Sequence, residues 1–209
     1  MAHFHATDMP IVLLDSAYPG VSGVEVDHRG GAYQSVGYLA SLGHRRIALV
    51  DRPHDPFVKN PISERLDGYV EARRDFGLAV VDDYLIMGNY SLASGRTAAA
   101  RLLSLPQPPT AIITGSDLQA LGVLEAARER GLGVPEDLSV VGYHDIQLSA
   151  YVGLTTVRLP TADLGRMAVE MLTEQLSEHA VGPVQRRVTG ELIVRGSSGP
   201  VPRVVNSAD

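Results

Sequence analysis

Hydrophobic residues along this chain form short continuous runs, which alternate with longer stretches where apolar positions recur every three or four residues. Short apolar runs are typical of parallel strands buried on both faces, and three-to-four spacing is typical of helices with one buried side. The runs predict strands at 11–14, 24–26, 47–50, 84–87, 111–114, 138–141, 155–157 and 191–194.

Helices are predicted between these strands, and their ends carry residues that start or stop helices. Gly43, Gly77 and Gly131 stand where a left-handed residue closes a helix. Asp117 is placed as a structural cap at the start of another. The predicted helices cover 30–42, 63–76, 91–105, 117–130 and 161–178. Alternation of strand and helix with short connections indicates an α/β fold, in which helices wrap parallel sheets.

Polar residues gather where the predicted strands end. In parallel sheets a ligand binds beyond the carboxyl ends of the strands, so these positions are the first candidates for a site. They are Asp15, Asp27, Asp51, Arg52, Asn89, Thr114, Ser116, Tyr143, His144 and Asp145. For Asp15 and Asp27, turn formation at a strand end is favoured over a carboxylate pair.

Arg65 lies in the first turn of a predicted helix, after a proline-rich loop. The helix dipole mildly disfavours a cation there, so the guanidinium is expected to have a partner. That partner is either a ligand's carboxylate or hydroxyl pair, which arginine can hold with two parallel hydrogen bonds, or a surface carboxylate of Glu64 or Asp67. The sequence leaves the two alternatives even.

Composition removes several classes of function. The chain has 209 residues, a formal net charge of −6 and no cysteine. Disulfide scaffolds, zinc–thiolate sites, iron–sulfur clusters and thiol catalysis are therefore excluded. An acidic chain is poorly suited to hold a phosphate backbone unaided. No apolar run reaches the roughly 20 residues that a membrane-spanning helix needs, and no secretory leader is recognised at the start.

The histidines give little sign of metal chemistry. His3 and His5 have the spacing of a metal pair, but a frayed terminus is the favoured interpretation. His44 follows Gly43 and is interpreted as a structural residue that reaches the last carbonyls of its helix. The sequence predicts no metal, no cofactor and no catalytic residue.

Seven ordered motifs together resemble one known family. They are LGHRRIA at 42–48, RLDGY at 65–69, the segment 109–122 that ends in SDLQALG, GLGVPEDLSVVGY at 131–143, LTTVR at 154–158, LGR at 164–166 and LIVRGS at 192–197. Between about residue 10 and residue 200, the chain resembles the effector-binding core of the lac-repressor (LacI/GalR) family of bacterial transcription regulators.

The resemblance implies a periplasmic-binding-protein-like fold, with two Rossmann-like subdomains of parallel sheets on either side of a cleft. Residues 1–54 and 158–188 would form the remnant of the N-terminal subdomain, 55–157 and 189–203 the C-terminal subdomain, and 204–209 a tail. The family's helix-turn-helix headpiece and the first strand–helix–strand–helix of the N-terminal subdomain have no counterpart in the sequence. The resulting expectation is a fragment of a longer protein, a dimer or domain swap that covers the gap, or a poorly ordered residual half.

The resemblance also assigns a ligand site. Arg65 takes the position of the family's effector-gripping arginine, Ser116 a pocket position, and His144 the position of an aspartate that usually binds ligand hydroxyls. Asp51, Arg52, Asn89, Tyr90 and Ile113 complete the predicted ligand-binding set. Because His144 and Ser116 replace what are often Asp and Asn, we also hypothesise a more acidic or phosphorylated ligand.

The predicted function is that of a cytoplasmic effector-sensing module and not an enzyme. Its partners would be a sugar or related metabolite, operator DNA only through a headpiece absent from this chain, and a second copy in a homodimer, with no membrane. The alternatives are a solute-binding protein of a sugar transporter, or a small hydrolase that uses His144 and Asp145. Adjacent residues on an extended segment point to opposite faces, which argues against that dyad.

Overall fold

The computed structural model describes residues 9–53, 61–79, 81–177 and 182–201. These residues form two separate sheets. The larger has six strands in the order β4-β3-β5-β6-β7-β9 and the smaller three in the order β1-β2-β8. All pairings are parallel except that of β7 with β9. The strands are β1 (Val12–Leu14), β2 (Ser22–Val26), β3 (Ile47–Asp51), β4 (Leu85–Met87), β5 (Ala111–Thr114), β6 (Ser139–His144), β7 (Thr155–Arg158), β8 (Gln185–Val188) and β9 (Glu191–Ile193).

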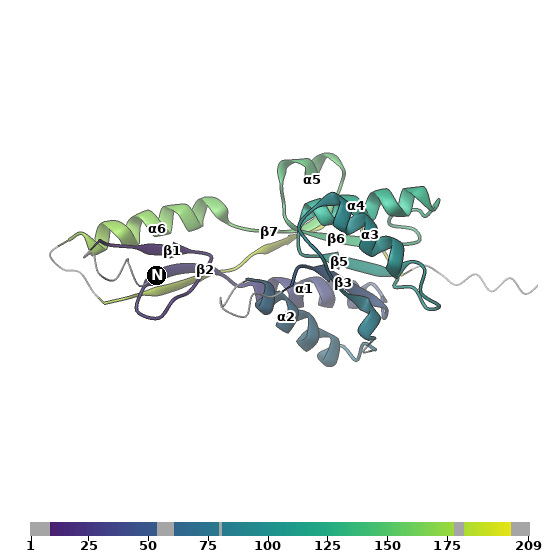
Figure 1. Ribbon diagram of the computed structural model, residues 1–209, viewed down its shortest axis with the longest axis horizontal. Coiled ribbons are helices and arrows are strands. Elements are labelled where there is room, and N and C mark those ends of the chain that lie inside the picture. Colours follow the sequence, from purple (N-terminus) through teal and green to yellow (C-terminus); the bar gives the residue numbers. More distant parts are fainter. Residues whose placement is uncertain (1–8, 54–60, 80, 178–181, 202–209) are drawn as a thin grey trace, which may run out of the picture.

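Helices cover both faces of the six-stranded sheet (Figure 1). On one face α1 (His28–Ser41) packs against α2 (Pro61–Asp75), and on the other α3 (Leu92–Leu102) packs against α4 (Asp117–Glu129). The short η1 (Asp82–Tyr84) precedes β4, and α5 (Gln147–Tyr151) follows β6. The long α6 (Thr161–Gln175) covers the small sheet.

Alternation of side chains along β3 explains why both faces of the large sheet are covered. Ala48 and Val50 lie in one buried cluster with residues of α3 and α4. Ile47 and Leu49 lie in a second cluster with residues of α1 and α2. Successive side chains of a strand point to opposite faces, so a continuous apolar run requires a helical layer on each side. The α/β architecture with parallel sheets is therefore confirmed.

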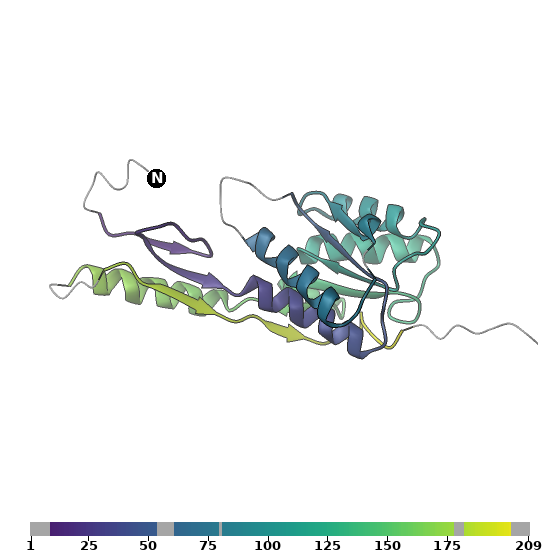
Figure 2. The same cartoon turned by 90° about the horizontal axis from the view of Figure 1, so that it is seen from below.

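The two sheets lie at opposite ends of the long axis of the molecule (Figures 1 and 2). The chain crosses between them three times, from β2 to α1, from β7 to α6 and from β8 to β9. A third apolar cluster lies between α6 and the small sheet, and it also contains Tyr143 and Val157 of the large sheet. The sheets are therefore joined by three chain crossings and one shared core.

The structure differs from the predicted elements in a few places. All eight predicted strands and five predicted helices occur, with ends shifted by a few residues, but η1, α5 and β8 were not predicted. The domain boundary expected at residue 54 does not coincide with the change of sheet, because β3 (Ile47–Asp51) lies inside the six-stranded sheet. The change falls between β2 and α1. No helix in the described ranges is long and apolar enough to cross a membrane.

Candidate functional site

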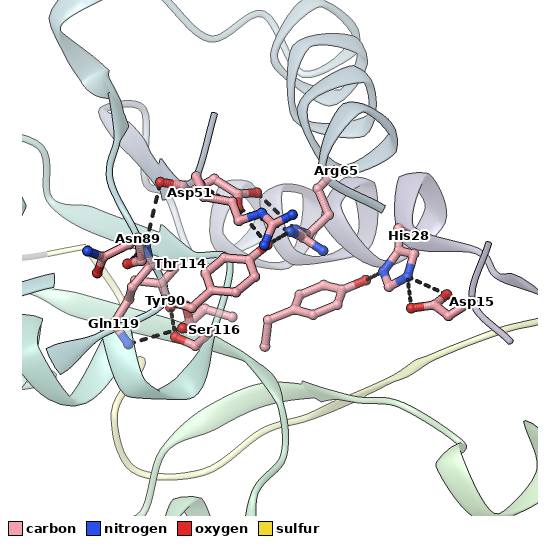
Figure 3. A network of polar contacts seen from close by, with 12 residues as sticks. Asp15, His28, Asp51, Arg65, Asn89, Tyr90, Thr114, Ser116 and Gln119 are labelled. Carbon is pink, nitrogen blue, oxygen red and sulfur yellow. Dashed lines mark hydrogen bonds and ion pairs between the residues drawn. The ribbon is translucent and has the colours of Figure 1, made fainter. Parts of the chain in front are cut away.

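The candidate site lies at the carboxyl edge of the six-stranded sheet (Figure 3). Asp51 ends β3, Tyr90 follows β4, Ser116 follows β5 and His144 ends β6. Because β3, β4, β5 and β6 run parallel, their carboxyl ends meet at one edge. Arg65 reaches this edge from α2.

A buried ion pair forms the centre of the site. Arg65 donates from Nε to Asp51 Oδ2 at 2.9 Å and from Nη2 to Asp51 Oδ1 at 3.0 Å. Only 3% of the Arg65 side chain and 1% of the Asp51 side chain are exposed. Burial lowers the pKa of Arg65, but its hydrogen bond and ion pair with Asp51 raise it more, so the net shift is upward. The partner of Arg65 within the chain is Asp51, and neither Glu64 nor Asp67, which the sequence had suggested.

Further donors satisfy the Asp51 carboxylate. The Tyr90 hydroxyl donates to Asp51 Oδ1 at 3.0 Å and accepts a hydrogen bond from Arg65 Nη2. The backbone N–H of Arg52 donates to the same oxygen at 2.8 Å. At Gly115 a Cβ would lie 2.2 Å from Asp51 Oδ1, so only glycine leaves room for the carboxylate there. Asp51, Arg65 and Tyr90 are therefore brought together, as the predicted site requires.

Aromatic rings surround the Arg65 guanidinium. Its carbon lies 5.0 Å from the ring centre of Tyr143 and 5.7 Å from that of Tyr90. Arg52 lies over the Tyr90 ring at 5.3 Å. His144 meets the rings of Tyr90 and Tyr143 edge-on, with centroids 6.3 and 5.5 Å apart. Burial and then the positive charge of Arg65 lower the pKa of His144, which favours a neutral imidazole.

The cap that was predicted at Asp117 is provided by its neighbour Ser116. Ser116 is the N-cap of α4, and its hydroxyl accepts a hydrogen bond from the Gln119 N–H. The prediction of Asp117 as the cap was wrong, because Asp117 is the first residue of the helix and Ser116 is the residue that precedes it. Asp117 is buried and accepts hydrogen bonds from the Ile146 N–H and from the hydroxyls of Ser149 and Thr156.

Asn89 and Ile113, two further residues of the predicted site, lie in different surroundings. The Asn89 carboxamide oxygen accepts a hydrogen bond from the Ser91 hydroxyl, and the Asn89 backbone carbonyl accepts one from Gln119 Nε2 at 3.0 Å. Gln119, which was not predicted, is fully buried beside the site. Ile113 lies in the apolar cluster between the sheet and helices α1 and α2, so the structure places its side chain in the core. Strand position alone did not distinguish these environments.

Asp15 and His28, from the N-terminal part of the chain, lie next to this edge. Asp15 was among the predicted strand-end residues, whereas His28 was missed. His28 is buried and bonds to both carboxylate oxygens of Asp15 through Nε2, at 2.9 and 3.0 Å, and to the Tyr143 hydroxyl through Nδ1 at 3.0 Å. The position of His28 directly after the strand-ending Asp27 could have drawn attention to it. Asp27 itself caps α1 by accepting from the Gly30 N–H, as expected of a turn residue.

The structure gives no support to a catalytic pair of His144 and Asp145. Asp145 instead pairs with Arg158 and Arg195, each at 2.8 Å. The sequence argument against this pair assumed that His144 and Asp145 lie on an extended segment. That assumption was wrong, because both residues have positive φ (109° and 57°) and the backbone turns there. The imidazole of His44 bonds to the Thr110 hydroxyl and to the Gly199 carbonyl, and only the backbone N–H of His44 bonds to the preceding helix, at the Leu39 carbonyl.

In the described part of the chain, no group of three or more His, Cys, Asp or Glu residues could hold a metal ion. His3 and His5 lie outside the described residues. The edge of the sheet instead offers hydrogen-bond donors, acceptors and aromatic faces, and its central charges are already paired. Groups of these kinds can bind a polar small molecule.

Comparison with known proteins agrees with this geometry. A family model described as a periplasmic binding protein-like domain matches residues 36–198. The HTH-type transcriptional repressor CytR of Escherichia coli (strain K12) is 39% identical over 182 residues, which are 86% of this chain and 52% of that protein. The chain thus spans about half the length of this curated relative.

Solved structures show the same relationship. A LacI-family regulatory protein from Chloroflexus aggregans has a TM-score of 0.87 at 32% identity, covering 95% of this chain and 72% of that chain. A LacI-family regulator from Enterococcus faecium with bound ribose has a TM-score of 0.80 at 27% identity, covering 91% of this chain and 71% of that chain. The family model and the solved structures agree, and the chain belongs to the LacI family, of which it represents the periplasmic-binding-protein-like effector domain.

Proposed function

We propose that this chain is the effector-sensing part of a cytoplasmic LacI-family transcriptional regulator. A small metabolite binds at the carboxyl edge of the six-stranded sheet, on the side that faces the small sheet. The observation that carries the proposal is the buried Asp51–Arg65–Tyr90 cluster at this edge. Operator DNA would be held by a part of the full protein outside these 209 residues.

The charges of the site favour a neutral ligand over an acidic or phosphorylated one. Asp51 already balances the charge of Arg65. His144 has a lowered pKa, so it supplies a neutral ring near pH 7. A phosphate would have to compete with Asp51 for the guanidinium and would leave a buried carboxylate unpaired. A neutral sugar or nucleoside could accept from the donors without breaking the pair, and the relative from Enterococcus faecium holds ribose.

Calorimetric titration would test this proposal. The purified chain would be titrated with D-ribose, other neutral pentoses and hexoses, nucleosides, and ribose 5-phosphate. We expect one neutral compound to bind. Arg65→Lys should weaken that binding at least about 10-fold, because a lysine cannot hold Asp51 with two parallel hydrogen bonds and so disturbs the centre of the site. Arg101→Lys, in an exposed pair with Asp83, is the matched control. Binding of the phosphate alone would contradict the neutral ligand, and turnover of a glycoside or ester would contradict the sensor.

We also propose that the chain pairs with a second copy through the surface around α5. Four exposed apolar side chains lie within seven consecutive positions there, and Tyr151 is 80% exposed. They are Ile146, Leu148, Tyr151 and Val152. Contiguous exposed apolar side chains commonly mark protein–protein contacts, and tyrosine is enriched at the centres of such contacts.

A further inference from the structure

A partly buried chain of hydrogen bonds runs from the small sheet to the candidate effector site. Asp15 directly follows β1 of the small sheet, His28 opens α1, and Tyr143 lies on β6 of the large sheet. Figure 3 shows Asp15 and His28 side by side, with Arg65 on the other side of His28 from Asp15. The His28 side chain is 2% exposed, and its ring bonds to Asp15 on one side and to the Tyr143 hydroxyl on the other.

The direction of these bonds follows from the chemistry of the groups. An ionised carboxylate only accepts, so His28 Nε2 donates to Asp15. In the tautomer that carries its hydrogen on Nε2, Nδ1 accepts from the Tyr143 hydroxyl. Burial raises the pKa of Tyr143, so the hydroxyl keeps its hydrogen. Loss of any one member would leave a buried polar group without its partner, which costs more than the bond itself contributes.

The backbone at Gly31 and Asp15 leaves room for the Asp15–His28–Tyr143 hydrogen bonds. At Gly31 of α1 a Cβ would lie 2.7 Å from the Tyr143 hydroxyl oxygen, so glycine provides the space. Asp15 takes a φ of 51°, which is uncommon for a residue other than glycine. Its carboxylate also accepts from the Val26 N–H at 3.2 Å, which ties it to the end of β2.

Tyr143 belongs to the site and to the link at once. Its ring lies against the Arg65 guanidinium and the His144 ring, and it packs in the apolar cluster with Val24 and Val26 of the small sheet. Another polar contact from the small sheet to the helices of the large one is that of Arg187 with Glu64, and the Arg187 side chain is 47% exposed. Water screens a half-exposed pair of this kind, so it holds geometry weakly.

We propose that Asp15, His28 and Tyr143 are positioning residues that set the orientation of the small sheet relative to the six-stranded sheet from within the effector site. A ligand that moves Arg65 or the Tyr143 ring then changes that orientation through the His28–Asp15 bond. The ligand step rests on the proposed function, whereas the link itself does not. The Tyr143 hydroxyl supplies the polar part of this link, beside the three chain crossings and the shared apolar core that also join the two sheets.

The absence of cysteine makes a distance measurement straightforward. Spin labels on Thr173→Cys of α6 and Arg128→Cys of α4, both exposed positions, would report the distance between the two bodies by pulsed electron paramagnetic resonance. In the unliganded chain we expect Tyr143→Phe and His28→Asn each to shift or broaden the distance distribution. The double variant should change it no further than either single variant, because both remove the same link.

Matched controls separate orientation from stability. Tyr84→Phe removes another buried hydroxyl, whose partner is the Gln107 carbonyl at 2.6 Å, and it should lower the melting temperature without changing the distribution. Arg187→Gln removes the exposed link and should leave the distribution unchanged. If His28→Asn does not fold, Asp15→Ala, which removes both acceptor oxygens, takes its place.

An unchanged distribution in folded Tyr143→Phe and in the His28 or Asp15 variant would overturn the inference, and so would an equal change in Tyr84→Phe. The measurement needs no effector. A failure of sugars to bind would therefore contradict the proposed function and leave the link standing, whereas an unchanged distance would do the reverse.

Discussion

At the scale of single residues, the site is built around the buried ion pair of Asp51 and Arg65. Removing two charges from water costs several kcal/mol per ion, and only good geometry with further hydrogen bonds offsets that cost. Asp51 meets this condition through four donors: two nitrogens of Arg65, the Tyr90 hydroxyl and the Arg52 N–H. The pair is therefore a fixed part of the fold before any ligand arrives.

Replacing Asp51 with Asn should be strongly destabilising, because it leaves the buried Arg65 guanidinium without a counter-charge. We expect the free energy of unfolding in urea, followed by circular dichroism, to fall by about 3–5 kcal/mol. Asp83→Asn breaks an exposed pair with Arg101 and should change stability by less than about 0.5 kcal/mol. Equal effects of the two substitutions would show that Asp51 is not a buried charge partner.

His144 should make stability depend on pH just below neutrality. The folded state lowers its pKa from 6.5, so the folded protein binds fewer protons than the unfolded chain in that range. The contribution of neutral His144 to the free energy of unfolding is present above pH 6.5, and it is lost as the pH falls from 6.5 through the folded-state pKa. Unfolding free energies measured between pH 7.5 and 5.0 should thus fall less steeply in His144→Asn than in the wild type. Parallel slopes would contradict this interpretation.

At the scale of elements, the close approach of α3 and α4 depends on glycine. At Gly122 of α4 a Cβ would lie 2.0 Å from the Leu92 carbonyl oxygen, and at Gly95 of α3 it would lie 2.0 Å from the Gln119 carbonyl oxygen. The two helix backbones therefore touch with no side chain between them. This contact matters for the site, because Ser116 and Gln119 are carried by the first turn of α4.

Gly122→Ala should push the two helices apart despite the higher helix propensity of alanine. Overpacking of this kind typically costs about 1–3 kcal/mol of unfolding free energy. Gly165→Ala in α6 is the matched control, because nothing lies within 4 Å of the added Cβ. It should be neutral or stabilise by up to about 1 kcal/mol. Chemical denaturation of both variants would compare the signs, and stabilisation by Gly122→Ala would refute the close contact.

At the scale of the whole molecule, the two bodies have different amounts of support. The six-stranded sheet has helices on both faces, whereas the small sheet has α6 and only three strands. Its strand β1 lies at an edge, with Leu14 52% exposed. Contacts with the larger body, including the shared core around Tyr143, therefore contribute a large part of what holds the small sheet in place.

Self-association through the α5 surface predicts a dimer of twice the 22.3 kDa chain mass. Tyr151→Glu should shift the mass measured by sedimentation equilibrium towards the monomer, since a buried carboxylate at the centre of an interface is costly. Val169→Glu on α6, where the native side chain is 65% exposed, should leave the mass unchanged. A wild-type chain that stays monomeric at high concentration would rule out this interface.

The sequence by itself determined the succession of strands and helices, the parallel α/β class and the family. These follow from local patterns, because apolar periodicity, glycine stops and ordered motifs act over a few residues. It missed β8, whose residues QRRV are polar and become a strand through pairing with β2. It also missed α5, which with five residues is too short for a periodic pattern.

Only the tertiary structure decided which polar groups meet. Arg65 finds Asp51 14 positions away, and His28 finds Tyr143 115 positions away. Such partners depend on strand order and on how closely the helices approach, neither of which local spacing encodes. The same reason explains the partners of Asp117, which lie 29 to 39 positions away in the sequence. A polar residue at a strand end is recognisable from the sequence, but whether it caps, pairs or faces a ligand is fixed by what the fold brings beside it.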